Sequence, residues 1–363
     1  MKKVPISLIV DDPAPGISVY YYHYIHGGNP VTEDGRPLIN KYPNSFLNEF
    51  CDMVDRWGMK GKFSVVPNPA GMGNVTSGVE GVSESELKEW LDTVKKRLLP
   101  SFSICPEMIT HTDALDITTG ESTGIPEMIW SRTQDRTTLT PYIAYAYSIL
   151  KEAGFDCCGV TPPGSFGLKT ERETLAAVAQ ATYDVWGKKN SWMFFRSLTG
   201  LPGAKPYIAY DDGDKCLVCI PATTNDATWQ TINSTETSDE YISRVADRTI
   251  TADGKGGQII DVLETGGYPV VFCHWQGLAS NGLYTGLRAM NEIGRRIKEH
   301  LSDRVEWMSY EEIMNMVIND KESYPMPDFE NMVENLLNDE WVRSRPDFSE
   351  EEIRSNPYFQ PLT

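Results

Sequence analysis

The sequence predicts an α/β fold in which strands and helices alternate around a largely parallel sheet. Short apolar runs with the length of buried strands alternate with longer segments of helical spacing from Val4 to Ile318, and no linker interrupts them. Several strand candidates also end abruptly in polar residues, as strands of parallel sheets do. These patterns leave open whether the sheet is barrel-like or doubly wound.

The first unit of this alternation covers residues 4–66. Residues 4–10 form a short apolar run that stops at two aspartates, which predicts a buried strand. Residues 44–57 carry apolar side chains at helical spacing, and Gly58 follows as a C-cap. Residues 62–66 form the next strand candidate, so the segment reads as a βαβ unit.

The same alternation continues along the chain. Ser83 and Glu86 form a capping box in front of a helix that Pro100 ends. The remaining candidates are a strand within 102–110, a helix at 139–153, a strand at 155–160, helices at 238–245 and 259–263, a strand at 268–273, a helix at 287–300, a strand at 305–308 and a helix at 310–318.

Two regions depart from this rhythm. Residues 197–236 are rich in Gly, Pro, Thr and Asp and contain short strand candidates, which predicts a hairpin insertion within a domain of residues 1–319. Residues 320–363 form an acidic tail with short helices expected at about 328–343 and 349–354. We expect this helical C-terminal tail to pack on the domain or on a partner chain, which would make a homo-oligomer.

Composition excludes several functional classes. The 33 Lys and Arg residues against 51 Asp and Glu give a net charge of −18, which disfavours nucleic acid and anionic membrane surfaces as partners. No apolar run approaches the roughly 18 residues of a membrane span. Because the first apolar run is too short for a signal peptide, we expect a cytoplasmic protein, or a mature form whose leader has been removed. Seven scattered cysteines indicate buried thiols.

Candidate functional residues follow three of the strand candidates. Asp11 and Asp12 end the first, His111 lies at or beyond the end of the third, and His274 ends the strand at 268–273. Carboxyl ends of parallel strands meet at one edge of a sheet, so these side chains are expected to converge. Imidazole and carboxylate groups together suit a divalent metal such as zinc. Seen singly, the aspartates also fit a turn and each histidine a buried core position.

Taken in order, six stretches resemble the polysaccharide deacetylase-like, NodB-type family. They are residues 8–12, 62–67, 107–112, 159–164, 270–274 and 305–309. The resemblance implies a distorted (β/α) barrel and a metal-dependent hydrolase that deacetylates a sugar or polysaccharide. It further implies that Asp11 is the general base, that Asp12 and His111 bind the metal, and that His274 is the general acid.

The sequence departs from the family pattern at two places. Leu115 stands where the family has its second metal-binding histidine, so Asp113 or Asp116 is expected to complete the divalent metal site, most simply a zinc site. The arginine that orients the catalytic aspartate in the family is replaced by Thr161 and Pro162.

Aromatic residues near these strand ends are candidates for carbohydrate binding. Tyr22 and His23 follow the first strand closely, and Trp275 follows His274, so their rings could line the site and stack on a sugar. Packing beneath a loop explains the same residues equally well, and Trp130 and Trp229 share this ambiguity.

Three functions remain open at this stage. The first is the metal-dependent deacetylase. The second, from a different class, is a barrel that has lost catalysis and binds a saccharide or a protein partner, which Leu115 and the missing arginine suggest. The third is a glycoside hydrolase that uses two carboxylates.

Overall fold

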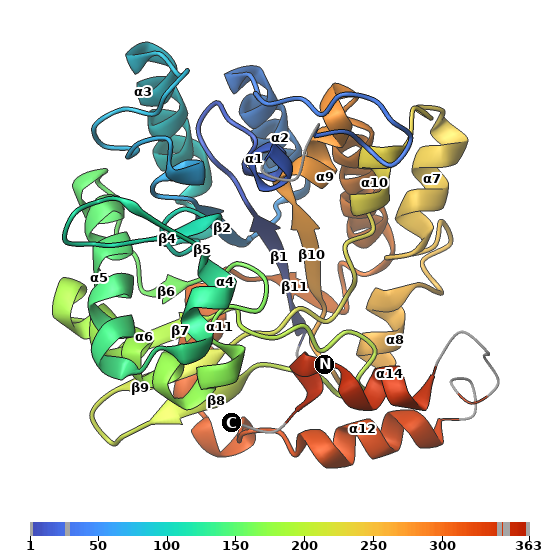
Figure 1. Ribbon diagram of the computed structural model, residues 1–363. Helices are drawn as coiled ribbons and strands as arrows, with labels where there is room; N and C mark the ends of the chain where they lie inside the picture. The colour runs from blue at the N-terminus through green and yellow to red at the C-terminus, as the bar shows by residue number, and fades with distance from the viewer. Residues whose placement is uncertain (1–2, 26–29, 340–342, 344–348, 361–363) are drawn as a thin grey trace.

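The computed structural model describes residues 3–25, 30–339, 343 and 349–360, which form a mixed α/β fold (Figure 1). A first sheet has five parallel strands in the order β10-β1-β2-β3, with β11 paired to the beginning of β1. Its strands are β1 (Val4–Asp11), β2 (Gly61–Val65), β3 (Phe102–Pro106), β10 (Val270–His274) and β11 (Val305–Trp307). Every residue of β2 and β3 is buried, as expected for parallel strands covered on both faces.

A second sheet contains four strands in the order β6-β7-β9-β8. They are β6 (Gly159–Val160), β7 (Asn190–Met193), β8 (Tyr207–Asp211) and β9 (Cys216–Cys219). β6, β7 and β9 are parallel, and only β8 is antiparallel to its neighbour. The region predicted as a hairpin insertion therefore supplies two strands of this sheet, because β9 pairs with β7 as well as with β8.

Two strands of the first sheet, β3 and β10, contact the second sheet or the segment that follows its strand β9. The amide of Thr161 donates to the carbonyl of Pro106 at 3.0 Å, and the amide of Thr223 donates to the carbonyl of Val270 at 3.1 Å. These are isolated contacts rather than continuous ladders, so closure into a barrel stays a prediction. The main hydrophobic cluster includes residues of both sheets, among them Val10 and Met193.

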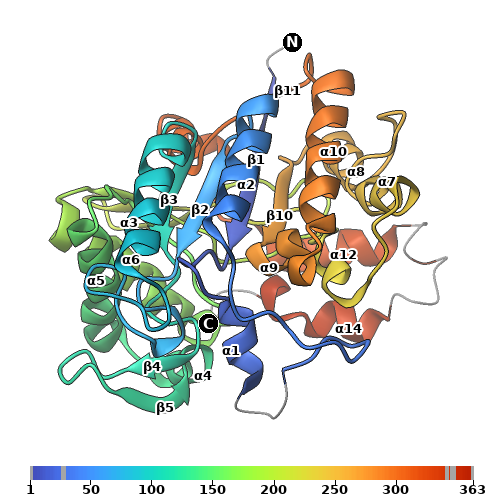
Figure 2. The same ribbon diagram turned by 90° about the horizontal axis from the view of Figure 1, so that it is seen from above.

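Helices surround the two sheets (Figures 1 and 2). They are α1 (Val19–Ile25), α2 (Asn44–Trp57), α3 (Glu84–Thr93), α4 (Glu127–Trp130), α5 (Arg136–Glu152), α6 (Glu171–Trp186), α7 (Asp239–Asp247), α8 (Gln258–Glu264), α9 (Trp275–Ala279), α10 (Thr285–His300), α11 (Tyr310–Ile318), α12 (Phe329–Asn338) and α14 (Glu350–Ser355). A small antiparallel hairpin, β4 (Asp113–Leu115) and β5 (Ser122–Pro126), follows β3. Among the described residues, no helix has the length and apolar character needed to cross a membrane.

Local sequence signals set several helix ends where they were predicted. Gly58 adopts a left-handed conformation, with φ of 64°, and its amide donates to the carbonyl of Val54, which ends α2. Ser83 and Glu86 form both hydrogen bonds of the predicted capping box in front of α3. All seven cysteines are buried and unbridged, as predicted.

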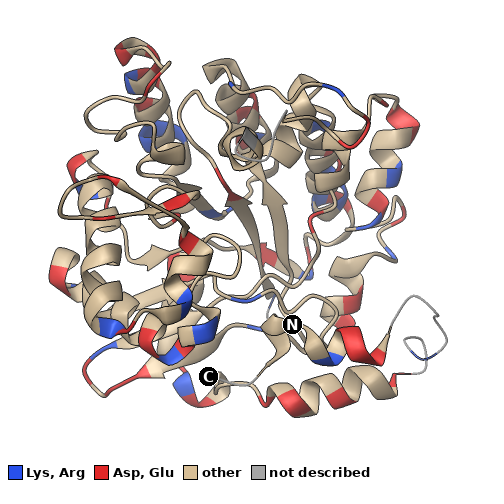
Figure 3. Ribbon diagram, in the orientation of Figure 1, with Lys and Arg blue, Asp and Glu red and all other residues tan. Residues whose placement is uncertain are grey.

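The C-terminal helices pack on the domain itself. Phe329, Val333 and Leu336 of α12 and Ile353 of α14 belong to the main hydrophobic cluster. The predicted helix at about 328–343 runs in part outside the described residues, because 340–342 are not among them. Figure 3 shows acidic and basic residues interspersed along the outer helices.

Candidate active site and metal centre

A cavity of about 450 Å³ opens where the parallel strands end. Side chains at or just beyond the carboxyl ends of β1, β3, β7 and β10 line it, together with α1. In Figure 2 the arrowheads of β1 and β10 point toward the side where α1 lies. A second cavity, of about 360 Å³, is lined by Phe102 at the start of β3 and contains none of the predicted site residues.

Asp12, Glu107 and His111 bring their side chains together in this cavity. Their nearest ligand atoms lie within 4.8 Å of one another. The Nε2 atom of His111 is 2.7 Å from Oδ1 of Asp12 and 3.4 Å from Oε1 of Glu107. Oδ1 of Asp12 is fully buried, and it forms an ion pair with the imidazole of His111.

The electrostatics of this cluster favour a positive charge at its centre. Burial, together with the charges of Asp11 and Asp12, raises the pKa of Glu107 to about 7. Burial lowers the pKa of His111, but Asp12 and Glu107 outweigh it and raise that pKa well above its ordinary value. Two carboxylates and an imidazole are ordinary ligands of a divalent cation. The donor set therefore fits a metal.

The ring of His111 is held from its other side by His23. Nε2 of His23 lies 2.6 Å from Nδ1 of His111, and the two rings meet edge to face. Metal-binding histidines commonly use their second ring nitrogen for a hydrogen bond that fixes the ring. His23, predicted as a substrate-binding residue, therefore lies beside the candidate metal centre.

The carboxylate that joins Asp12 and His111 in the cluster belongs neither to Asp113 nor to Asp116, the two residues expected from the sequence. Asp113 starts β4 and its carboxylate accepts from Ser122, whereas the carboxylate of Asp116 accepts the amide of Thr118 in the turn between β4 and β5. The chain turns away after His111 into this hairpin, which carries both aspartates out of the cluster. Glu107 supplies the carboxylate instead. It lies directly after β3, four residues before His111 in the sequence.

The backbone around the cluster is strained. Asp12, Met108 and His111 have φ of 69°, 45° and 64°, a region that non-glycine residues rarely adopt and that costs about 1–3 kcal/mol each. The buried carboxylate of Glu127 accepts the amides of residues 109, 110 and 111 at 2.9–3.2 Å. Because this group holds three successive amides, Glu127 fixes the loop that presents His111.

Asp11 is paired with a buried lysine. The Nζ atom of Lys62, whose side chain is fully buried, donates to Oδ1 of Asp11, to Ser64 at 2.8 Å and to Thr161 at 2.7 Å. Burial lowers the pKa of Lys62, but the charge of Asp11 outweighs it, so the lysine stays protonated. Thr161 stands at the position expected for an orienting arginine. Its hydroxyl accepts a hydrogen bond from Lys62, and Lys62 contacts Asp11.

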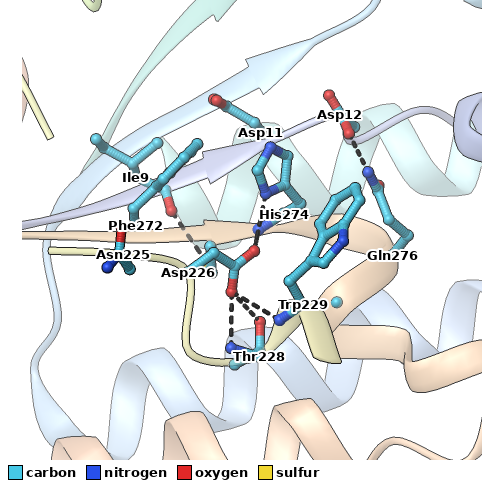
Figure 4. Close-up of polar contacts among 12 residues, drawn as sticks. Ile9, Asp11, Asp12, Asn225, Asp226, Thr228, Trp229, Phe272, His274 and Gln276 are labelled. Carbon is cyan, nitrogen blue, oxygen red and sulfur yellow. Dashed lines mark hydrogen bonds and ion pairs between the residues drawn. The ribbon is translucent and has the colours of Figure 1, made fainter. Parts of the chain in front are cut away.

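His274 forms a dyad with Asp226, a residue that the sequence analysis missed. Nδ1 of His274 donates to Oδ2 of Asp226 at 2.8 Å, and the backbone amide of His274 donates to the same oxygen at 3.1 Å (Figure 4). The amides of Thr228 and Trp229 hold the other oxygen of Asp226. Burial lowers the pKa of His274, but this hydrogen bond and the charges of Asp12 and Asp226 raise it to about 9. His274 is therefore protonated at neutral pH.

Two of the three predicted substrate-binding residues lie elsewhere. Tyr22 packs against the hydrophobic core, whereas Tyr20 and Tyr24 on another face of α1 line the cavity. Trp275 is 1% exposed and its ring packs among core aromatics, including Phe46 at 4.4 Å. Trp229 lines the cavity in its place and meets His274 edge to face at 4.8 Å.

Comparisons with known proteins find distant structural likenesses only. No family model matches the chain, and no curated protein sequence matches it. The fold is similar to a "putative polysaccharide deacetylase from Mycobacterium smegmatis", with 13% identity over 90% of this chain and 93% of that chain and a TM-score of 0.49. It is also similar to the lactam utilization protein of Thermus thermophilus, with 16% identity over 72% of this chain and 92% of that chain and a TM-score of 0.33. Any functional proposal therefore rests on the residues of the site.

Proposed function

We propose that the protein is a metal-dependent hydrolase that removes acetyl groups from a carbohydrate. One observation carries this proposal: a candidate metal cluster, a carboxylate paired with a buried lysine, and a protonated histidine face the same cavity. Asp12, Glu107 and His111 would hold the metal. When bound, the metal polarises a carbonyl and lowers the pKa of water.

The other groups supply the proton transfers. The carboxylate of Asp11 takes a proton from the attacking water, and Lys62 and Ser64 keep that carboxylate oriented toward the cavity. His274, protonated on both nitrogens, keeps Nδ1–H on Asp226 and donates its Nε2 proton to the leaving amine or alcohol. Nε2 has no hydrogen-bond partner among the described residues, so this proton is available.

The two reasons for a non-catalytic binding protein are weakened by specific contacts. Glu107 takes the place of the ligand that Leu115 cannot provide, and Lys62 takes the place of the missing arginine. The glycoside hydrolase alternative needs a carboxylic acid as proton donor. Asp226 is engaged by His274, Asp11 by Lys62, and Glu107 by the candidate metal cluster, which supports a histidine donor instead.

The metal can be tested first. Purified protein is incubated with Zn²⁺, Co²⁺, Ni²⁺ or Mn²⁺ and dialysed, and metal per chain is measured by mass spectrometry. We expect about one ion per chain in the wild type, and loss of that ion in His111→Ala and Glu107→Gln. Asp116→Asn is the matched control and should keep the ion, because its carboxylate caps a turn outside the cavity.

Activity is then measured as acetate released from N-acetylated and O-acetylated saccharides by the metal-loaded protein. Asp11→Asn and His274→Ala should abolish release while metal content stays normal. Full activity in both variants, or an Asp116→Asn variant that loses metal as His111→Ala does, would refute the proposed site.

A further inference from the structure

The C-terminal segment, defined here as the described residues 324–339 and 349–360, reaches the candidate active site. After α12 and α14, a short 3-10 helix at Pro357–Phe359 places Tyr358 among the residues that line the cavity, with Asp11 and His274. The C-terminal segment therefore contributes to the wall of the cavity as well as covering the outside of the domain.

A buried arginine attaches the end of this segment to the second sheet. Arg196, 1% exposed, follows β7 and pairs with the buried carboxylate of Glu171. Its Nη1 atom donates to the carbonyl of Tyr358 at 2.6 Å and to the carbonyl of Gln360 at 2.8 Å. Charge-assisted hydrogen bonds from a buried guanidinium are strong and directional, so the backbone at Tyr358 is held at a fixed place.

Apolar contacts hold the segment on either side of this anchor. The guanidinium of Arg196 lies 4.5 Å from the centre of the Phe329 ring of α12. Ile353 and Phe359 are 8% and 6% exposed and belong to the main hydrophobic cluster. Burying apolar side chains of this size stabilises the docked segment. The segment is therefore a fixed part of the cavity wall.

The side chain of Tyr358 is available to contact a ligand in the cavity. It is half-buried, and its hydroxyl has no hydrogen-bond partner among the residues that the structure describes. Burial and the nearby charge of Asp11 raise the pKa of Tyr358, which keeps the hydroxyl neutral and able to donate. A neutral phenol offers both an apolar ring face and one hydrogen bond, the combination that suits a sugar ring with its hydroxyl groups.

We propose that Tyr358 is a substrate-binding residue, so that the C-terminal segment helps to determine which short saccharide the cavity accepts. This rests on the proposed function and names a determinant of specificity within that site. A cavity of about 450 Å³ lies within the range of small-molecule sites, about 300–1,000 Å³, which favours a short saccharide or the end of a chain.

Three variants test this role. Tyr358→Phe removes only the hydroxyl, and Tyr358→Ala also removes the ring. Tyr324→Phe is the matched control, because it removes a hydroxyl from the same segment that bonds Tyr268 and does not line the cavity. The probes are N-acetylglucosamine and its short chitin-type oligomers. Kd is measured by calorimetry on the metal-loaded protein, KM and kcat by acetate release, and folding by Tm.

We expect Tyr358→Phe to raise Kd and KM about five- to tenfold, the effect of one lost hydrogen bond, with kcat nearly unchanged. Tyr358→Ala should raise them further and change the preference among oligomer lengths, and Tyr324→Phe should change neither. Unchanged Kd and KM in both Tyr358 variants, with normal Tm, would overturn the inference and leave the proposed function standing.

Failure of the proposed function gives a different result. If the wild type binds a saccharide without releasing acetate, deacetylation is refuted and the Kd values still decide the role of Tyr358. If the wild type neither binds nor cleaves any probe, the cavity is not a saccharide site of this kind and both proposals fall.

Discussion

The two sheets contribute different kinds of residue to the candidate site. The first sheet and the turns directly after its strands supply the groups that would bind metal or move protons: Asp11, Asp12, Glu107, His111 and His274. The second sheet and the segments after its strands supply groups that hold those residues or wall the cavity: Thr161, Phe194, Phe195, Asp226 and Trp229. In this molecule the groups that would bind metal or move protons lie on the first sheet together with the positioning residues Lys62 and Ser64, and the second sheet adds further positioning residues and part of the cavity wall.

The largest expected effect comes from breaking the buried pair on the first sheet. Lys62→Met leaves the carboxylate of Asp11 buried without its cation, and loss of one partner of a buried pair typically costs about 3–5 kcal/mol. Urea unfolding should show this loss, and acetate release should disappear. Lys62→Arg keeps the charge and should recover part of both.

A double variant separates stability from catalysis. Asp11→Asn with Lys62→Met removes both charges, so the free energy of unfolding should recover relative to Lys62→Met alone while activity stays absent. If Lys62→Met alone is as stable and as active as the wild type, the lysine does not orient Asp11, and the first sheet supplies its reactive groups without this positioning residue.

The next effect tests a positioning residue from the second sheet. Asp226→Asn removes the charge that helps to raise the pKa of His274 to about 9. Activity requires protonated His274. The alkaline limb of the pH–activity profile should therefore move from about pH 9 toward the ordinary histidine value of about 6.5, and activity at pH 8 should fall roughly tenfold or more. The same interaction stabilises the fold fully below about pH 6.5, and this contribution is lost as pH rises through about 9.

The titration of His274 can also be followed directly. Nuclear magnetic resonance of the imidazole reports its pKa without any substrate, in the wild type and in Asp226→Asn. Asp113→Asn is the control, because that carboxylate faces the β4–β5 hairpin. An unchanged imidazole pKa in Asp226→Asn would contradict the dyad.

Sequence reasoning located much of the first sheet's chemistry because that chemistry follows strand ends. Asp11, Asp12, His111 and His274 stand where apolar runs stop, and parallel strands bring such positions to one edge. Lys62 was hidden because it lies inside a strand, where only the pairing of β2 with β1 shows that it faces Asp11. Trp275 follows His274 directly. Neighbouring residues at a strand end point in different directions, so the side chain of Trp275 lies in the core.

The second sheet was harder to foresee for a different reason. α2 was predicted with its observed bounds because its caps and amphipathic spacing are local. Every residue of α6 from Thr174 to Ala179 is buried, so the helix shows no single apolar face in its sequence. Asp226 lies in a loop whose place depends on the order of strands, which local patterns do not encode.

The smallest expected effect concerns the wall that the second sheet provides. Trp229→Leu removes the ring that meets His274 and Tyr20 edge to face, at 4.8 and 5.2 Å. Because aromatic contacts of this kind are worth about 0.5–1.5 kcal/mol, KM should rise about two- to tenfold while metal content and kcat change little. Trp186→Leu, whose ring packs on Tyr147 away from the cavity, is the matched control. A Trp229→Leu variant that loses metal, or whose kcat falls at unchanged KM, would show that this ring takes part in metal binding or catalysis. The difference between the reactive groups of the first sheet and the cavity wall of the second would then not hold.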